Sequence, residues 1–121
     1  MSSWNYPRAT ITNIHDGDTV TADVDLGFDT TRTANVRLLG CNAIELSKPG
    51  GKEAQANLAG IMPIGTVIAL RSVKWDKYGD RVDGAITLPN GQDLVTLLIN
   101  TGWAAAWDGV GTAPIPAWPR P

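Results

Sequence analysis

Strict alternation of apolar and polar residues between positions 19 and 26 constrains the fold more than any other feature of the chain. The apolar positions fall on every second residue: Val20, Ala22, Val24 and Leu26. Threonine and aspartate occupy the positions between them. Because successive side chains of a β-strand point to opposite faces, this segment is predicted to be a strand with one apolar and one polar face.

Four more segments are predicted to be strands. They cover residues 10–14, 32–39, 66–75 and 82–88. A turn is expected at residues 26–29, and the sequence Pro-Asn-Gly at residues 89–91 predicts a turn that closes the last strand. The chain is therefore expected to be mainly β.

Two segments have the spacing of helices instead. Within residues 51–62, one helix face collects the apolar residues Ala54, Leu58, Ile61 and Met62. Pro63 ends this helix because proline cannot continue one. A second helix is predicted over residues 94–100, with Asp93 as its N-cap and Gly102 just past its end.

The predicted order of elements is three strands, a helix, two strands and a helix. This order fits a mainly β, α+β fold with two or three helices, built on a five-stranded OB-fold barrel. A five-stranded α+β sandwich is the alternative. The 121 residues suit one domain. We assign that domain to residues 1–108 and treat residues 109–121, rich in proline and glycine, as a tail laid along the surface by Trp118.

Charge and composition limit the classes of function. The formal net charge of −2 does not suit a protein that coats nucleic acid through bulk electrostatics, so a bound phosphate would need a local cation cluster or a divalent metal. Cys41, the single cysteine, cannot form an internal disulfide. No signal peptide and no apolar run long enough for a membrane span are present, so we expect an intracellular monomer that does not bind membranes.

Candidate metal ligands lie in two places. Asp16 and Asp18 flank Gly17, which is also the pattern of an ordinary turn. Asn42 and Glu45 follow the strand predicted at residues 32–39, in an irregular segment where side chains can converge on a site. The alternatives are a turn residue for Asn42 and a solvated carboxylate for Glu45.

Candidate phosphate ligands lie on a strand and a turn. Arg37 points away from the face shared by Val36 and Leu38, either to solvent or into a pocket. The planar guanidinium of an arginine suits phosphate better than the ammonium group of a lysine does, because it donates two parallel hydrogen bonds. The turn at residues 76–81 carries Lys77, Tyr78 and Arg81. It is either a plain polar turn or a cationic finger with an aromatic ring that stacks on a base.

A nitrogen–sulfur metal site is not expected. The chain has one histidine, His15, and one cysteine, Cys41, so four such ligands cannot be assembled. Cys41 lies among apolar residues and is predicted to be a small buried hydrophobe.

Five short segments follow one another along the chain: HDGDTV (15–20), VRLLGCNAIE (36–45), GGKEA (50–54), DKYG followed by an arginine (76–81) and DLVTLLINTGWA (93–104). In this order they resemble the staphylococcal nuclease (thermonuclease-like) family. Each motif is short, but the ordered set is specific and spans about residues 9–108. The resemblance implies a five-stranded OB barrel with helices and calcium-dependent hydrolysis of phosphodiester bonds in DNA and RNA. The short chain without a signal segment would suit a phage or bacterial nuclease.

The resemblance also assigns a metal site. Calcium would be bound by Asp18, by Asn42 and by the backbone carbonyl of Ala43, with Asp16 near the metal but not a ligand. Asn42 stands where the family has an aspartate, which removes a negative charge from the site. Ile44 stands where the family has a proline, which makes the turn before Glu45 less rigid.

The same resemblance assigns roles in catalysis and substrate binding. Arg37, Glu45 and Arg81 would be catalytic, and Lys77 and Tyr78 would contact the substrate phosphate. Asp80 stands where the family has its second arginine, which follows one residue later as Arg81. The expected function is therefore a calcium-dependent nuclease. The alternative is a catalytically weakened module that only binds nucleic acid or protein.

Overall fold

The computed structural model describes residues 3–75 and 81–120. Its strands are β1 (Trp4–Ile14), β2 (Thr19–Gly27), β3 (Thr30–Leu38), β4 (Cys41–Ala43), β5 (Val67–Trp75), β6 (Arg81–Thr87) and β7 (Ala104–Ala106). Its helices are α1 (Gly51–Ile61) and α2 (Leu94–Asn100). No helix in the described part of the chain is long and apolar enough to cross a lipid bilayer.

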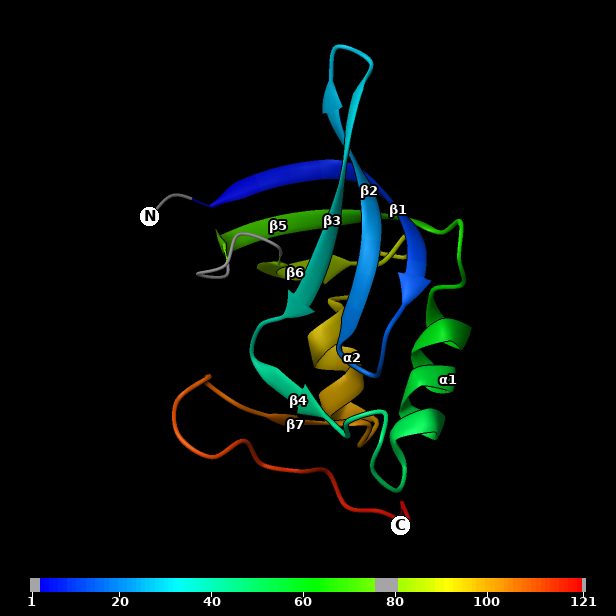
Figure 1. Cartoon of the computed structure of the whole chain (residues 1–121), viewed down its shortest axis with the longest axis vertical. Coiled ribbons are helices and arrows are strands. Elements are labelled where there is room, and N and C mark those ends of the chain that lie inside the picture. Colours follow the sequence, from blue (N-terminus) through cyan, green and yellow to red (C-terminus); the bar gives the residue numbers. More distant parts are fainter. Residues whose placement is uncertain (1–2, 76–80, 121) are drawn as a thin grey trace.

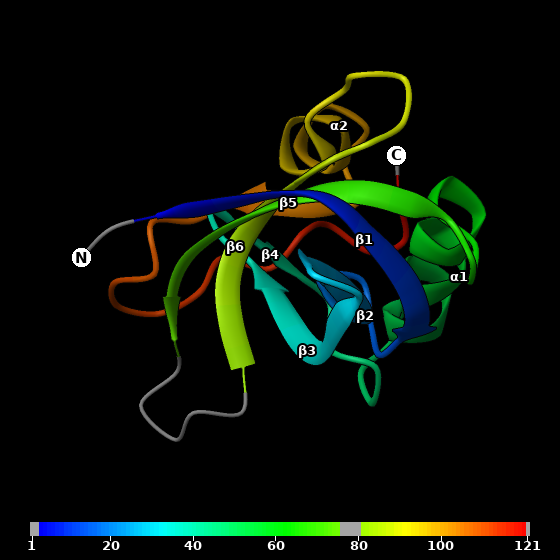
Figure 2. The same cartoon turned by 90° about the horizontal axis from the view of Figure 1, so that it is seen from above.

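Five strands close into a barrel in the order β1-β2-β3-β6-β5, and β5 pairs back with β1 (Figures 1 and 2). Strands β3 and β6 run parallel, whereas the other barrel pairs are antiparallel. The predicted mainly β fold with an OB-type barrel is therefore confirmed. Closure of the barrel excludes the sandwich alternative.

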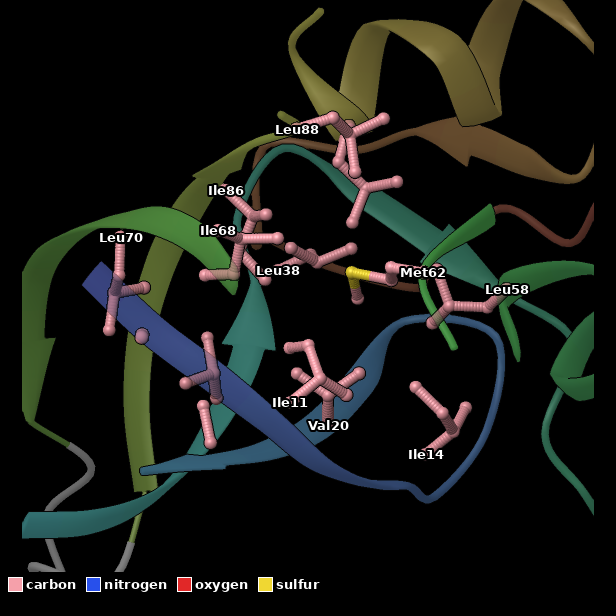
Figure 3. Packing of buried hydrophobic residues seen from close by; sticks show 14 of the residues in the cluster. Ile11, Ile14, Val20, Leu38, Leu58, Met62, Ile68, Leu70, Ile86 and Leu88 are labelled. Atoms are coloured by element: carbon pink, nitrogen blue, oxygen red, sulfur yellow. The ribbon is translucent and has the colours of Figure 1, made fainter. Parts of the chain in front are cut away.

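The period-2 pattern is confirmed by burial. In β2 the side chains of Val20, Ala22 and Val24 are buried, whereas Leu26, predicted on the same face, is 43% exposed near the end of the strand. Figure 3 shows Leu38, Ile68 and Ile86 meeting inside the barrel, with Leu58 and Met62 reaching the same core from α1 and the residue after it. Burial of this apolar surface is the main force that holds the strands in register.

Both helices begin and end close to the predicted residues. Ala54 and Leu58 of α1 are buried, and Pro63 follows the helix. The Asp93 carboxylate accepts a hydrogen bond from the Thr96 backbone N–H at 3.0 Å, which caps α2. Gly102 lies just past α2 with φ +81°, as expected for the residue that ends a helix.

Three strands, β1, β4 and β7, differ most from the prediction. Strand β1 begins at Trp4 rather than residue 10, because its first part pairs with β5 from Trp4 to Tyr6, before an irregularity in the register between Tyr6 and Ala9. The segment expected to be irregular contains β4, which pairs with the unpredicted β7. These two strands have only three residues each and mostly small side chains. They are too short to show the alternation of apolar and polar residues that predicts a strand.

Close packing at Gly17 brings the β1–β2 turn onto β4 and α1. A Cβ atom at Gly17 would lie 2.8 Å from the Ala43 Cβ and 2.9 Å from the Ala54 Cβ. Any larger residue would therefore push these elements apart. This contact sets the aspartates on either side of Gly17 next to β4.

The segment after β7 runs below the two-stranded sheet of β4 and β7, as Figure 1 shows. Trp118 lies 6.3 Å from Trp103, measured between ring centroids, and a Cβ at Gly50 would lie 2.6 Å from the Trp118 ring. The Arg120 guanidinium stacks 4.2 Å from the Trp103 ring centroid. Trp118 thus holds the tail against the domain.

Candidate functional site

An ion pair between Asp18 and Arg37 is the centre of the candidate site. The Arg37 Nη1 lies 2.9 Å from the Asp18 Oδ2. Strand pairing sets this contact, because Arg37 is directly opposite Thr19 in the β2–β3 register. The Leu38 backbone N–H also donates to the Asp18 carbonyl at 3.0 Å, which fixes the start of β2 against the end of β3.

Three further hydrogen bonds hold the Asp18 side chain and its loop. The Ala43 backbone N–H donates to Asp18 Oδ2 at 2.8 Å, and the Thr19 hydroxyl donates to Oδ1 at 3.1 Å. The Asp16 Oδ1 accepts from the Asp18 backbone N–H at 3.0 Å. Asp18 is only 5% exposed, so these polar contacts replace the water that the carboxylate has lost.

The environment of Asp18 raises its pKa from 3.8 to about 6. The largest cause is burial, which disfavours the charged form, and the neighbouring Asp16 acts in the same direction. Arg37 and the Ala43 N–H oppose the rise by stabilising the carboxylate. A buried carboxylate with a raised pKa beside a fixed cation is common at functional sites.

Arg37 also binds the side chain of Asn42, which lies on β4. Its Nη2 donates to the Asn42 Oδ1 at 3.3 Å, so one guanidinium bridges Asp18 and Asn42. The Nη1 donates in addition to the Leu38 carbonyl at 3.1 Å. The Asn42 Nδ2 donates to the Pro114 carbonyl at 2.9 Å and thereby ties the site to the tail.

Glu45 lines a cavity of about 640 Å³ beside this cluster. Asn42 and Ala43 line the same cavity, and tail residues including Ile115 and Trp118 form its other wall. Glu45 itself is exposed, whereas the preceding Ile44 is buried and anchors the loop. Asn42, which binds Arg37, therefore lines the same cavity as Glu45.

A tight loop fixes the backbone of Glu45. Its carbonyl accepts from the Lys48 N–H at 2.9 Å, and a Cβ at Gly51 would lie 1.9 Å from that carbonyl oxygen. Only glycine fits at Gly51, so the start of α1 can approach the loop closely. The motif GGKEA thus contributes packing that positions the Glu45 loop.

Arg81 lies on the same face of the barrel as Arg37. In the parallel β3–β6 pair, Arg81 is opposite Asn35 and Asp83 is opposite Arg37, whereas the buried Val82 points inward. Strand period therefore turns the Arg81 side chain to the outer face, two residues along the register from Arg37. Its Nε lies 3.9 Å from the Asp83 Oδ1.

Two predicted substrate ligands, Lys77 and Tyr78, lie outside the described residues, as does Asp80. Three residues without an assigned role, His15, Thr21 and Asn35, form a hydrogen-bonded chain. The His15 Nε2 lies 2.6 Å from the Thr21 hydroxyl, which donates to the Asn35 Oδ1 at 2.7 Å.

Cys41 is buried, as predicted, and burial raises its pKa to about 11. A neutral, buried thiol is a poor nucleophile.

The wall that the tail adds to the Glu45 cavity was not predicted. It carries no sequence signal, because Pro114 meets Asn42 across 72 residues of chain.

The Arg37 guanidinium takes up the space that a calcium ion bound to Asp18 and Asn42 would need. Calcium takes about 6–8 oxygen ligands, and the Asp18 carboxylate and the Asn42 amide oxygen are of the right chemical type. The Arg37 guanidinium, however, lies between these two side chains and binds both. Within residues 3–75 and 81–120, no group of three or more histidine, cysteine, aspartate or glutamate side chains is placed to hold a metal.

Neither a protein-family model nor a curated protein sequence matches the chain. The function is therefore inferred from the residues and their geometry.

Proposed function

We propose that the protein is a phosphodiester hydrolase that cleaves DNA or RNA. The observation that carries this proposal is the Arg37 guanidinium, which binds Asp18 and Asn42, together with the cavity that Asn42 lines in common with Glu45. A guanidinium can bind a phosphate, and an exposed carboxylate can activate the water that attacks it.

Each side chain has a separate role in this proposal. Arg37 donates to the non-bridging oxygens of the phosphate, where negative charge builds up during attack. Arg81, on the same face, adds a second cation along the strand. Glu45 orients the attacking water and takes its proton, since an exposed carboxylate on a loop can reach the cavity.

Calcium is part of the proposal as a cofactor. When bound, it would act as a Lewis acid and supply positive charge that a protein of net charge −2 lacks. Asp18, Asn42 and the Ala43 carbonyl are the proposed ligands. Their use requires the Arg37 guanidinium to leave its place between Asp18 and Asn42, which a phosphate would favour by offering it a new acceptor.

Cleavage of labelled single-stranded DNA, with calcium at millimolar concentration or with EDTA, tests the proposal. We expect cleavage only with calcium, and a loss of about 10²-fold or more in rate for Glu45→Gln and for Arg37→Ala. Lys52→Ala, a charge change on the exposed surface of α1, is the matched control and should keep the wild-type rate. No cleavage by wild-type protein, or full activity of Glu45→Gln, would contradict the proposal.

The second candidate is a module that only binds nucleic acid or protein. The bridge from Arg37 to both Asp18 and Asn42 favours it, because a guanidinium already satisfied by two side chains competes with a metal for them. Thermal unfolding with and without calcium separates the two candidates. A nuclease with a calcium site melts at a higher temperature in calcium, whereas the binding module does not.

A further inference from the structure

A second cavity, of about 480 Å³, opens at the end of the barrel away from Glu45. Inward-facing Val24, Leu70 and Val82 are among its lining residues. Their burial at the barrel interior makes them its floor. The volume lies within the range of about 300–1,000 Å³ that is typical of ligand sites.

Aromatic side chains form the rim of this mouth. Trp4 is 65% exposed and Trp75 is 44% exposed, and both line the cavity together with Tyr6. Register brings them together, since Trp4 pairs with Ser72 of β5 and Trp75 pairs with Val82 of β6. Figures 1 and 2 show the start of β1 and the end of β5 on the same side of the barrel.

The charged lining residues of the mouth are cations. The Arg32 guanidinium lies 4.4 Å from the Trp75 ring centroid, and Lys74 is the other cation. Among the described residues that line the cavity, none is acidic. Lys74 is 3.9 Å from Asp83, which lies opposite Arg37 in the neighbouring pair of strands.

We propose that the barrel mouth binds a nucleobase, with the attached phosphate on Arg32 or Lys74. Exposed tryptophan faces stack on bases of any sequence, and arginine adds a cation–π contribution. The rim cations complement the negative charge of a phosphate. The row of side chains from Lys74 through Asp83 to Arg37 links this mouth to the proposed phosphate site.

This site would bind the same class of ligand as the proposed function, nucleic acid, but its binding does not require cleavage. Binding is therefore measured in EDTA, where no hydrolysis is expected. Fluorescence anisotropy of a labelled decathymidylate gives the affinity for a strand, and calorimetry with thymidine monophosphate gives the affinity for a free nucleotide. Binding of both ligands identifies a nucleotide site, whereas binding of the strand alone identifies a site for nucleic acid.

Trp4→Ala is the main variant, because Trp4 is largely exposed and its removal leaves the core intact. We expect the affinity for the bound ligand to fall about 5- to 150-fold. Trp4→Phe, which retains a ring, should recover most of the affinity. Phe28→Ala removes a fully exposed aromatic ring at the tip of the β2–β3 hairpin, outside the mouth, and should bind as wild type.

The proposal is overturned if wild-type protein binds neither ligand. It is also overturned if Trp4→Ala and Trp75→Ala, shown to be folded by circular dichroism, both bind within twofold of wild type. An inactive protein whose binding depends on Trp4 would support this inference and contradict the nuclease. A protein that cleaves DNA but binds it equally well without Trp4 would support the nuclease and contradict this inference.

Discussion

Arg37 is the residue on which the candidate site depends. Its guanidinium compensates a buried carboxylate and holds the Asn42 amide, so it is both a structural bridge and the proposed phosphate ligand. Arginine suits both tasks, because its planar fork donates to two acceptors at once. Replacement by lysine would leave one of the two acceptors without its donor.

Titration of Asp18 should be visible in the free energy of unfolding. The raised pKa means that folded protein binds a proton more readily than unfolded protein between about pH 4 and 6. Protonated Asp18 therefore stabilises the folded protein below that range. The protein loses this contribution as the pH rises through 6. On going from pH 7 to pH 4, the free energy of unfolding of the wild type should rise by about 2–3 kcal/mol relative to that of Asp18→Asn.

Urea unfolding of wild type and Asp18→Asn at both pH values measures this difference. Taking the difference between the two proteins cancels the titration of the groups they share. A wild type that loses stability relative to the variant at pH 4 would show that the Arg37 ion pair outweighs burial and lowers the pKa of Asp18 instead.

At the level of elements, long segments with clear alternation were predictable and short ones were not. Strand β2 repeats its pattern over enough residues to fix its faces, and α1 and α2 have stop or cap residues at their ends. Strands β4 and β7 exist only because they pair with each other, so local sequence could not reveal them. Pairing with β5 likewise extends β1 beyond its alternating part.

The tail should depend on Trp118 for its position. Trp118→Ala removes the contacts with Trp103 and with the backbone at Gly50, so we expect a loss of about 1–2 kcal/mol in the free energy of unfolding. Faster proteolysis within residues 109–117 should accompany it. Val110→Ala, at an exposed position of the same segment, is the control. Equal cleavage rates for Trp118→Ala and wild type would show that other contacts hold the tail.

For the molecule as a whole, the sequence identified side chains that the fold brings together. Asp18, Arg37, Asn42 and Ala43 meet through direct contacts. The sequence could not show that Arg37 occupies the space between two proposed metal ligands, since rotamers depend on the packed site. Neither could it show the cavity wall supplied by the tail, which depends on a contact between distant segments.

Net charge sets an expectation for how salt affects binding. With ten basic and twelve acidic residues, the protein should bind nucleic acid through a few local cations. Each phosphate contact with a single strand contributes about −0.7 to the slope of log affinity against log salt. We expect a slope of about −1.5 to −3 in EDTA, reduced in magnitude by about 0.7 in Arg37→Ala. An unchanged slope in this variant would place Arg37 away from the phosphate.

The position of the Arg37 guanidinium in a complex tests the central claim most directly. A crystal structure of Glu45→Gln, chosen to prevent cleavage, with calcium and a short single-stranded DNA would show it. We predict a phosphate oxygen within hydrogen-bonding distance of Arg37, and the residue 45 side chain in the same cavity. A DNA strand bound elsewhere, with Arg37 still bridging Asp18 and Asn42, would contradict the account.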